Sequence, residues 1–247
     1  MDARPDPRAA RRRALFLAAT EPARTLVSAG GAAAGAVPLL RWAPRGEPHP
    51  VLVLPGLLAS DASTQVLRTW VRRLGYPVVG WALGRNRGPS TEIEEELPRL
   101  VDRLAGEHGT SVTVIGWSLG GIFARTLARK APRQVRQVIS LGSPFATTQP
   151  WVTTGRRPRR TSLARPLPVP STAVYSRWDG VVDWRACRQE PGPASENVAV
   201  RSSHLGMGHD PAVLWVVADR LAQPRHDWQP FDRPTRFGLG TLFPAED

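Results

Sequence analysis

Ser118 stands between Gly116 and Gly120 in the sequence GWSLG. Residues 112–115 before it are mostly β-branched and apolar, which is typical of a buried strand. Residues 122–130 after it carry apolar side chains at helical spacing. A serine at such a strand-to-helix turn matches the G-x-S-x-G nucleophile elbow, which exposes the hydroxyl for attack on an electrophile.

The geometry of the turn explains why glycine stands on both sides of the serine. The turn is sharp and strained, so a side chain at either flank would collide with neighbouring backbone. The helix that follows directs its N–H groups and positive dipole end at the reacting oxygen. The alternative is an ordinary glycine-rich turn that contains a serine by chance, but the strand before and the helix after favour the elbow.

A serine hydroxyl is a weak nucleophile and needs a base, and the base needs a third group that orients it. In chains with this elbow the acid and then the histidine follow the serine, each after a late strand. Asp179 lies in the turn that leaves the strand predicted at 172–176, and His204 follows the strand predicted at 198–201. The sequence therefore predicts Asp179 and His204 as partners of Ser118.

Three other residues compete for these roles. Asp183 is better interpreted as a turn residue or the start of a helix, and His209 comes just before another helix start. Ser143 lacks the flanking glycines of an elbow. The remaining histidines lie in boundary, helix-end and tail segments and are predicted to be surface residues: His49, His108 and His226.

A tetrahedral intermediate also needs two backbone donors for its oxyanion. One is the N–H of Leu119, directly after the serine, and the other comes from the loop after the first core strand. In that loop Gly56 lets the chain turn so that the N–H of Leu57 can point inward. The alternative is that Pro55 and Gly56 simply end the strand.

The composition limits the remaining possibilities. A chain of 247 residues with 41% hydrophobic residues suits one domain with a sizeable core. Cys187 is the single cysteine, so no intrachain disulfide and no cysteine-based metal site can form. No histidine pair has the spacing of metal ligands. We therefore expect no metal or cofactor, and a cytoplasmic protein.

The net charge of +12 favours anionic partners. Arginine carries nearly all of it, since Lys130 is the only lysine, and this fits a GC-rich coding bias as well as a function. No nucleic-acid motif is present, so the partner that we expect is an anionic membrane in peripheral contact. Residues 14–20 form a short apolar run after a basic start, ended by Glu21 and Pro22. We expect an amphipathic helix there, on the domain or on a membrane surface.

Strands and helices alternate from residue 51 onward, which predicts an α/β fold with a mostly parallel central sheet and helices on both faces. We divide the chain into an N-terminal extension (1–48), helical at least in part, and a catalytic domain (49–222). A proline-rich tail (223–247) is expected to pack on that domain. Within the domain, residues 145–170 break the rhythm and are predicted to form a surface loop or a short flap.

Together these motifs resemble the α/β-hydrolases, and more narrowly the small bacterial lipases and esterases with little or no lid. The resemblance covers about residues 51–221 and is carried by VLPGL at 53–57, the elbow at 116–121, LGSPF at 141–145, YSRWDGVV at 175–182 and SHLG at 203–206. It implies Ser118 as nucleophile, Asp179 as acid, His204 as base, and Leu57 and Leu119 as oxyanion donors. Many relatives have histidine in place of Pro55 or Trp117, and these departures affect the fit of the acyl chain.

The resemblance implies a carboxylic ester hydrolase, similar to esterases and triacylglycerol lipases, that acts through an acyl-enzyme on small-molecule or lipid esters. An acyltransferase would use the same three residues with an alcohol or thiol in place of water. A non-catalytic protein that binds a membrane or a partner on a hydrolase scaffold is the other alternative. The sequence leaves the substrate and the oligomeric state open.

Overall fold

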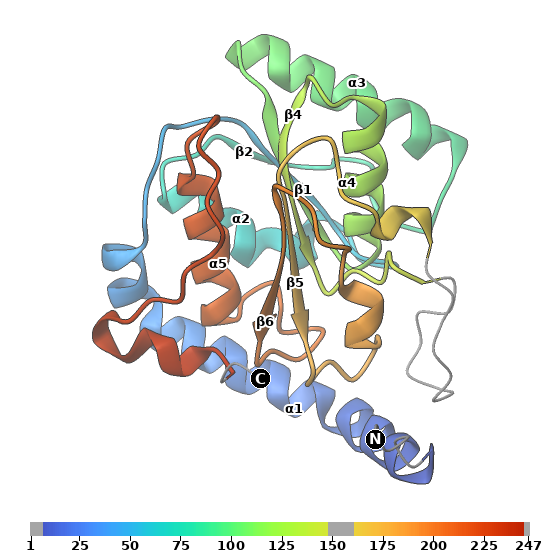
Figure 1. Cartoon of the computed structure of the whole chain (residues 1–247), viewed down its shortest axis with the longest axis vertical. Helices are drawn as coiled ribbons and strands as arrows, with labels where there is room; N and C mark the ends of the chain where they lie inside the picture. The colour runs from blue at the N-terminus through green and yellow to red at the C-terminus, as the bar shows by residue number, and fades with distance from the viewer. Residues whose placement is uncertain (1–6, 148–160, 245–247) are drawn as a thin grey trace.

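Six parallel strands form one sheet in the order β2-β1-β3-β4-β5-β6 (Figure 1). The computed structural model describes residues 7–147 and 161–244. The strands are β1 (Val51–Leu54), β2 (Val78–Gly80), β3 (Val112–Trp117), β4 (Val135–Leu141), β5 (Ser171–Ser176) and β6 (Ser195–Val200). Because all of them are parallel, their carboxyl ends meet at one edge of the sheet, where the loops that leave β1, β3, β5 and β6 come together.

Helices cover both faces of the sheet, as the alternation of elements predicts. The helices are α1 (Pro7–Trp42), α2 (Gln65–Arg73), α3 (Thr91–His108), α4 (Leu119–Lys130) and α5 (Pro211–Ala222). Helices α2 and α5 pack on one face together with the end of α1, and α3 and α4 pack on the other. The fold is therefore a three-layer α/β sandwich.

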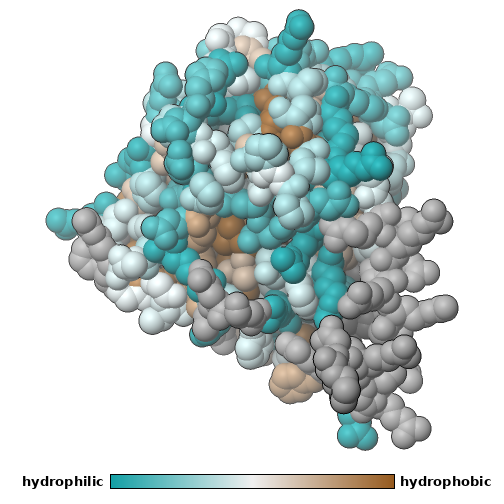
Figure 2. Space-filling view, in the orientation of Figure 1, coloured by the Kyte–Doolittle hydropathy of each residue, from teal (hydrophilic) through white to brown (hydrophobic). Residues whose placement is uncertain are grey.

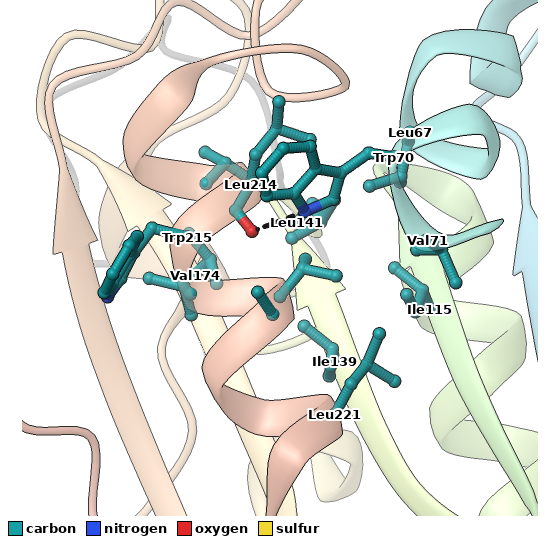
Figure 3. Close-up of a cluster of buried hydrophobic side chains, with 14 of the residues drawn as sticks. Leu67, Trp70, Val71, Ile115, Ile139, Leu141, Val174, Leu214, Trp215 and Leu221 are labelled. Atoms are coloured by element: carbon teal, nitrogen blue, oxygen red, sulfur yellow. Dashed lines mark hydrogen bonds between the residues drawn. The ribbon is translucent and has the colours of Figure 1, made fainter. Parts of the chain in front are cut away.

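The strand residues alternate between the two apolar layers. Val51 and Val53 join the cluster under α2 and α5, whereas Leu52 and Leu54 join the cluster under α3 and α4. In the first cluster the Trp70 indole of α2 donates a hydrogen bond of 2.9 Å to the Leu214 carbonyl of α5 (Figure 3). This period of two is what fully buried strands of a parallel sheet require.

The N-terminal helix is much longer than the apolar run that predicts it. Helix α1 continues through Glu21 and Pro22 to Trp42, so these two residues do not end it. It also includes the alanine- and glycine-rich stretch at 29–40, which the sequence leaves undecided between helix and linker. Figure 1 shows α1 lying across the end of the sheet at which β5 and β6 terminate.

Two segments depart from regular strand–helix alternation. A short 3-10 helix forms at Ser162–Ala164, and the arginine-rich part of the expected loop, at 156–160, lies outside the described residues. The tail contains a 3-10 helix at Arg236–Leu242. Phe243 is buried in the cluster under α5, against the partly buried Phe231.

The face seen in Figure 2 is mostly hydrophilic, with small apolar areas between the polar side chains. Among the described residues, no helix combines the length and apolarity that crossing a bilayer requires.

Candidate active site

Ser118 occupies the strained turn between β3 and α4. Its backbone has φ 53° and ψ −120°, a conformation that residues with a side chain rarely adopt. A Cβ on Gly116 would lie 2.4 Å from the backbone of Gly120, and a Cβ on Gly120 would lie 2.3 Å from the Leu54 carbonyl oxygen. Both glycines are therefore required by close backbone approach, and the predicted elbow geometry is present.

Ser118, His204 and Asp179 are joined by hydrogen bonds. His204 Nε2 lies 3.1 Å from Ser118 Oγ, and His204 Nδ1 lies 2.7 Å from Asp179 Oδ2. An ionised carboxylate can only accept, so Nδ1 carries the proton and Nε2 is left to accept from the serine hydroxyl. Both Asp179 and His204 are buried, which strengthens these interactions.

Asp179 is held by its own turn at the end of β5. The Oδ1 atom of Asp179 accepts hydrogen bonds of 2.8 Å from the N–H groups of Val181 and Val182. The other oxygen, Oδ2, is thereby left for His204. Ser176 Oγ, at the last residue of β5, accepts from the N–H of Trp178 and tightens the same turn.

His204 is held by contacts with Trp117 and with the loop after β4. The Trp117 indole donates a hydrogen bond of 3.2 Å to the His204 carbonyl, and a Cβ on Gly208 would lie 2.9 Å from its ring. Gly142 has φ 53°, and a Cβ there would lie 3.3 Å from His204 Nδ1 and 2.9 Å from Met207 Sδ. The sequence shows Trp117 only as a departure from related lipases, but in the structure its indole contacts the loop that carries His204.

The rival residues have structural partners instead. Asp183 accepts from the N–H of Arg185 at 2.9 Å and caps a short 3-10 helix, as predicted. His209 donates through Nε2 to the Thr25 carbonyl. Ser143 is buried and donates to backbone carbonyls around the elbow.

The predicted oxyanion donors lie in the segments that flank Ser118. Leu119 is the first residue of α4, so its N–H has no acceptor within the helix. A Cβ on Gly56 would come within 3.2 Å of Ser118 Cβ, which places the loop with Leu57 beside the serine. In the described parts of the chain, neither the Leu57 nor the Leu119 N–H donates to another protein group.

Asn86 fixes this loop, and sequence reasoning missed it. Its side-chain amide donates to the Pro55 carbonyl at 2.9 Å, and its backbone carbonyl accepts from the N–H of Leu58 at 2.6 Å. Leu58 has φ 61°, so the loop has a strained backbone that needs such support. Asn86 is fully buried, but nothing in the arginine- and glycine-rich segment around it signals this burial in the sequence.

His49 is a correction to the sequence analysis. It was predicted to be a surface residue, but it is buried just before β1, with Nε2 2.8 Å from Thr113 Oγ1 and Nδ1 3.0 Å from the Glu47 carbonyl oxygen. Burial lowers the pKa of His49 to about 4, so the ring is neutral at pH 7. It lies at the amino ends of the strands, away from Ser118. His108 and His226 are exposed, as predicted.

Comparison with known proteins supports the fold described above. A sequence model of the Esterase family matches residues 83–203. Aspergillus fumigatus lipase B is similar in structure over 83% of this chain and 61% of its own, with a TM-score of 0.59 and 17% identity. The monoacylglycerol lipase of Paleococcus ferrophilus matches over 73% and 97%, with a TM-score of 0.53 and 14% identity. The chain therefore has the α/β-hydrolase fold.

The matches to sequence relatives cover shorter stretches. The mouse protein named serine hydrolase BPHL is 29% identical over 112 residues, which are 41% of this chain and 38% of the mouse protein. The pimeloyl-[acyl-carrier protein] methyl ester esterase of Vibrio campbellii is 34% identical over 59 residues, 23% of each chain. The matches thus span well under half the length of these relatives.

The arrangement of Ser118, His204 and Asp179 suits nucleophilic chemistry. The serine hydroxyl faces an unprotonated imidazole nitrogen, and the imidazole is oriented by a buried carboxylate. Within residues 7–147 and 161–244, no cluster of three or more His, Cys, Asp or Glu side chains could hold a metal ion. Cys187 is buried, and burial raises the pKa of its thiol well above the usual value, which makes it unreactive.

Proposed function

We propose that this chain is a serine hydrolase that cleaves carboxylic esters. The observation that carries the proposal is the continuous hydrogen-bonded line from Ser118 Oγ through His204 to Asp179, starting at a strained elbow. The match to the Esterase family and the partial matches to a serine hydrolase and a methyl ester esterase support it.

In the first half of the reaction Ser118 Oγ attacks the ester carbonyl carbon while His204 Nε2 takes the hydroxyl proton. The carbonyl oxygen becomes an oxyanion that accepts hydrogen bonds from the N–H groups of Leu57 and Leu119. Asp179 stabilises the imidazolium. When the tetrahedral intermediate collapses, the bond to the alcohol breaks and His204 returns the proton to the leaving alkoxide.

The second half regenerates the enzyme. Water attacks the acyl group on Ser118, and His204 Nε2 takes one proton from it as the new bond forms. A second tetrahedral intermediate then releases the carboxylic acid, and Ser118 recovers its proton from His204. An acyltransferase would differ only in the acceptor of this half-reaction, where an alcohol or thiol replaces water.

The substrate within the class is a small-molecule or lipid ester. Exposed apolar side chains adjoin the site residues: Leu57 and Leu58 in the loop after β1, Trp178 beside the acid, and Leu205 beside the base. Apolar contacts of this kind favour acyl chains over charged ester groups. We therefore propose uncharged acyl esters as substrates, with lipid esters presented at a membrane surface among them.

The test is hydrolysis of p-nitrophenyl esters of increasing acyl length by wild type and by Ser118→Ala. We expect Ser118→Ala to lose several powers of ten in kcat, because the nucleophile is absent. Ser111→Ala is the matched control. The Ser111 hydroxyl is buried just before β3, at the end opposite Ser118, and has no hydrogen-bond partner among the described residues, so its removal should leave kcat unchanged.

The acyl length with the highest kcat/KM distinguishes an esterase from a lipase. Folded wild type that hydrolyses no ester of the series, with or without an added alcohol or thiol acceptor, would contradict the proposal. It would then favour a scaffold that binds without catalysis. Product formation only when the acceptor is present would instead identify an acyltransferase.

A further inference from the structure

Helix α1 places one buried carboxylate against both loops that carry the acid and the base. Glu21 is only 4% exposed, although Leu15 and Phe16, earlier in the same helix, are 62% and 63% exposed. A carboxylate buried in this way costs free energy unless its oxygens are bound by donors. The donors that bind Glu21 therefore show what the helix is attached to.

The two oxygens of Glu21 contact different loops. Oε2 accepts from the N–H of Gly180 at 3.1 Å, and Oε1 accepts from the N–H of Leu205 at 2.8 Å. Gly180 directly follows Asp179, and Leu205 directly follows His204. A single side chain thus joins the backbone next to the acid to the backbone next to the base.

Neighbouring residues of α1 reinforce the same contacts. Arg24 pairs with Glu21 Oε2 at 2.8 Å and also donates to the Trp178 carbonyl in the acid turn. Thr25 Oγ1 donates to the Glu21 carbonyl and lies 3.0 Å from Ser203 Oγ in the base loop. The guanidinium supplies the opposite charge that a buried carboxylate needs, while the two carboxylate oxygens accept from both loops.

The approach between α1 and the acid turn is also close. A Cβ on Gly180 would lie 2.4 Å from the Leu17 carbonyl oxygen, so only glycine allows the helix to reach this position. Leu17 itself is buried. The turn therefore contributes a glycine to this close contact, and the helix contributes a buried leucine.

We propose that Glu21 is a positioning residue, which sets the separation and orientation of Asp179 and His204 by holding the backbone beside each of them. The inference rests on the proposed hydrolase function and extends it to a residue far from the motifs. Glu21 does not touch the reacting atoms. It acts through the 2.7 Å hydrogen bond between His204 Nδ1 and Asp179 Oδ2, whose two ends lie on separate loops.

The variant Glu21→Gln tests this with little change in shape. A glutamine amide has one accepting oxygen, so it can bind only one of the two N–H groups, and its NH₂ group would face the other donor. We expect kcat to fall by about 10- to 100-fold, since displacements near 1 Å cost about that much, while KM changes little. Glu21→Asp, too short to reach both loops, should show a similar loss and keeps the charge for Arg24.

Glu196→Gln is the matched control. Glu196 is also a largely buried glutamate that pairs with an arginine (Arg220, 2.7 Å) and accepts from a backbone N–H (Phe231, 2.6 Å). It lies at the amino end of β6, opposite the site. The Glu196→Gln variant should lose thermal stability as Glu21→Gln does, but its kcat should remain that of wild type.

A second measurement does not depend on turnover. The proton that His204 Nδ1 shares with Asp179 should give a low-field ¹H NMR signal, assigned by its absence in His204→Ala. We expect the signal to broaden or shift in Glu21→Gln or Glu21→Asp and to persist in Glu196→Gln. If wild type hydrolyses no ester but the signal still depends on Glu21, the proposed function fails and the positioning role stands.

The positioning role would be overturned by wild-type kcat and an unchanged signal in folded Glu21→Gln and Glu21→Asp. It would equally be overturned if Glu196→Gln lost as much kcat, because the effect would then reflect general stability. If Glu21→Gln does not fold, Glu21→Asp decides by the same two measurements.

Discussion

Asp179 and Asp183 both bind backbone N–H groups through Oδ1, and of the two it is Asp179 that places its other oxygen against His204. Asp179 uses Oδ1 for two backbone N–H groups and leaves Oδ2 facing His204. Asp183 uses Oδ1 for the N–H of Arg185 and for that residue's guanidinium. The choice by position along the chain therefore agrees with the geometry, while the catalytic role itself stays a prediction.

We expect Asp179→Asn to lower kcat by about 10⁴-fold, because an asparagine oxygen and NH₂ can hold His204 in the wrong tautomer. Asp183→Asn should stay within a factor of a few of wild type, because asparagine also caps a helix well. Steady-state kinetics on one p-nitrophenyl ester measures both. Equal losses in the two variants would show that Asp179 is not the acid.

His49 makes the stability of the fold depend on pH. Burial lowers the pKa of its ring to about 4, from 6.5 in the unfolded chain. Between these values the unfolded chain binds the proton more readily, so the free energy of unfolding falls as the pH drops from about 6.5 to about 4. The contribution is complete above pH 6.5, and we expect about 2 kcal/mol of it to be lost at about pH 5.

Urea unfolding of wild type and of His49→Gln at several pH values measures this term. Glutamine keeps a polar side chain beside Thr113 but does not titrate, so the difference between the two proteins isolates the ring. The variant should be less sensitive to pH over this range. A pH dependence identical in both proteins would assign the acid sensitivity to other groups.

At the scale of elements, the strands and most helices could be predicted because each repeats its own pattern. The run 51–54 and the elbow at 116–120 combine apolar periodicity with glycine or proline stops. Helix α1 could not be predicted in the same way. Its first apolar run stops at Glu21 and Pro22, and its contacts are made with loops about 160 and 180 residues further along the chain.

The same reasoning explains which parts of the site the sequence reveals. Ser118, Asp179 and His204 each follow a recognisable strand, so chain order predicts that they meet. Residues that fix the site from outside, such as Asn86 and Glu21, have no such local signature. Their partners are backbone groups, which nearly every residue has, so the sequence does not indicate these contacts.

Glycines offer a direct test of how tightly the elements are packed. A Cβ on Gly120, at the start of α4, would lie 2.3 Å from the Leu54 carbonyl oxygen, whereas a Cβ on Gly106, inside α3, would meet nothing within 4 Å. Gly120→Ala should therefore force α4 away from β1 and cost about 1–3 kcal/mol or more. Gly106→Ala should stabilise α3 by about 0.5–1 kcal/mol.

Thermal unfolding of the two variants measures this contrast. Both replace glycine with alanine in a helix, so propensity alone would raise the Tm of both. Only the close contact between α4 and β1 separates them. A Tm for Gly120→Ala equal to or above that of wild type would mean that the elbow tolerates a side chain there.

At the scale of the whole molecule, a net charge of +12 and the apolar side chains beside the site would both favour contact with a membrane. Leu57, Leu58, Trp178 and Leu205 are all at least 45% exposed and belong to loops at the carboxyl edge of the sheet. A molecule with excess positive charge is attracted to an anionic bilayer, and exposed apolar side chains can then insert. Such docking would bring the site to lipid esters.

We therefore expect the Ser118→Ala protein, which cannot consume lipid, to bind vesicles containing phosphatidylglycerol and to bind phosphatidylcholine vesicles much more weakly. Raising the salt from about 0.1 M to about 1 M shortens the Debye length from about 10 Å to about 3 Å, so most of the binding should be lost. Co-sedimentation with vesicles at both salt concentrations measures this. Equal binding to both lipids, independent of salt, would show that apolar contact rather than charge brings the protein to a membrane.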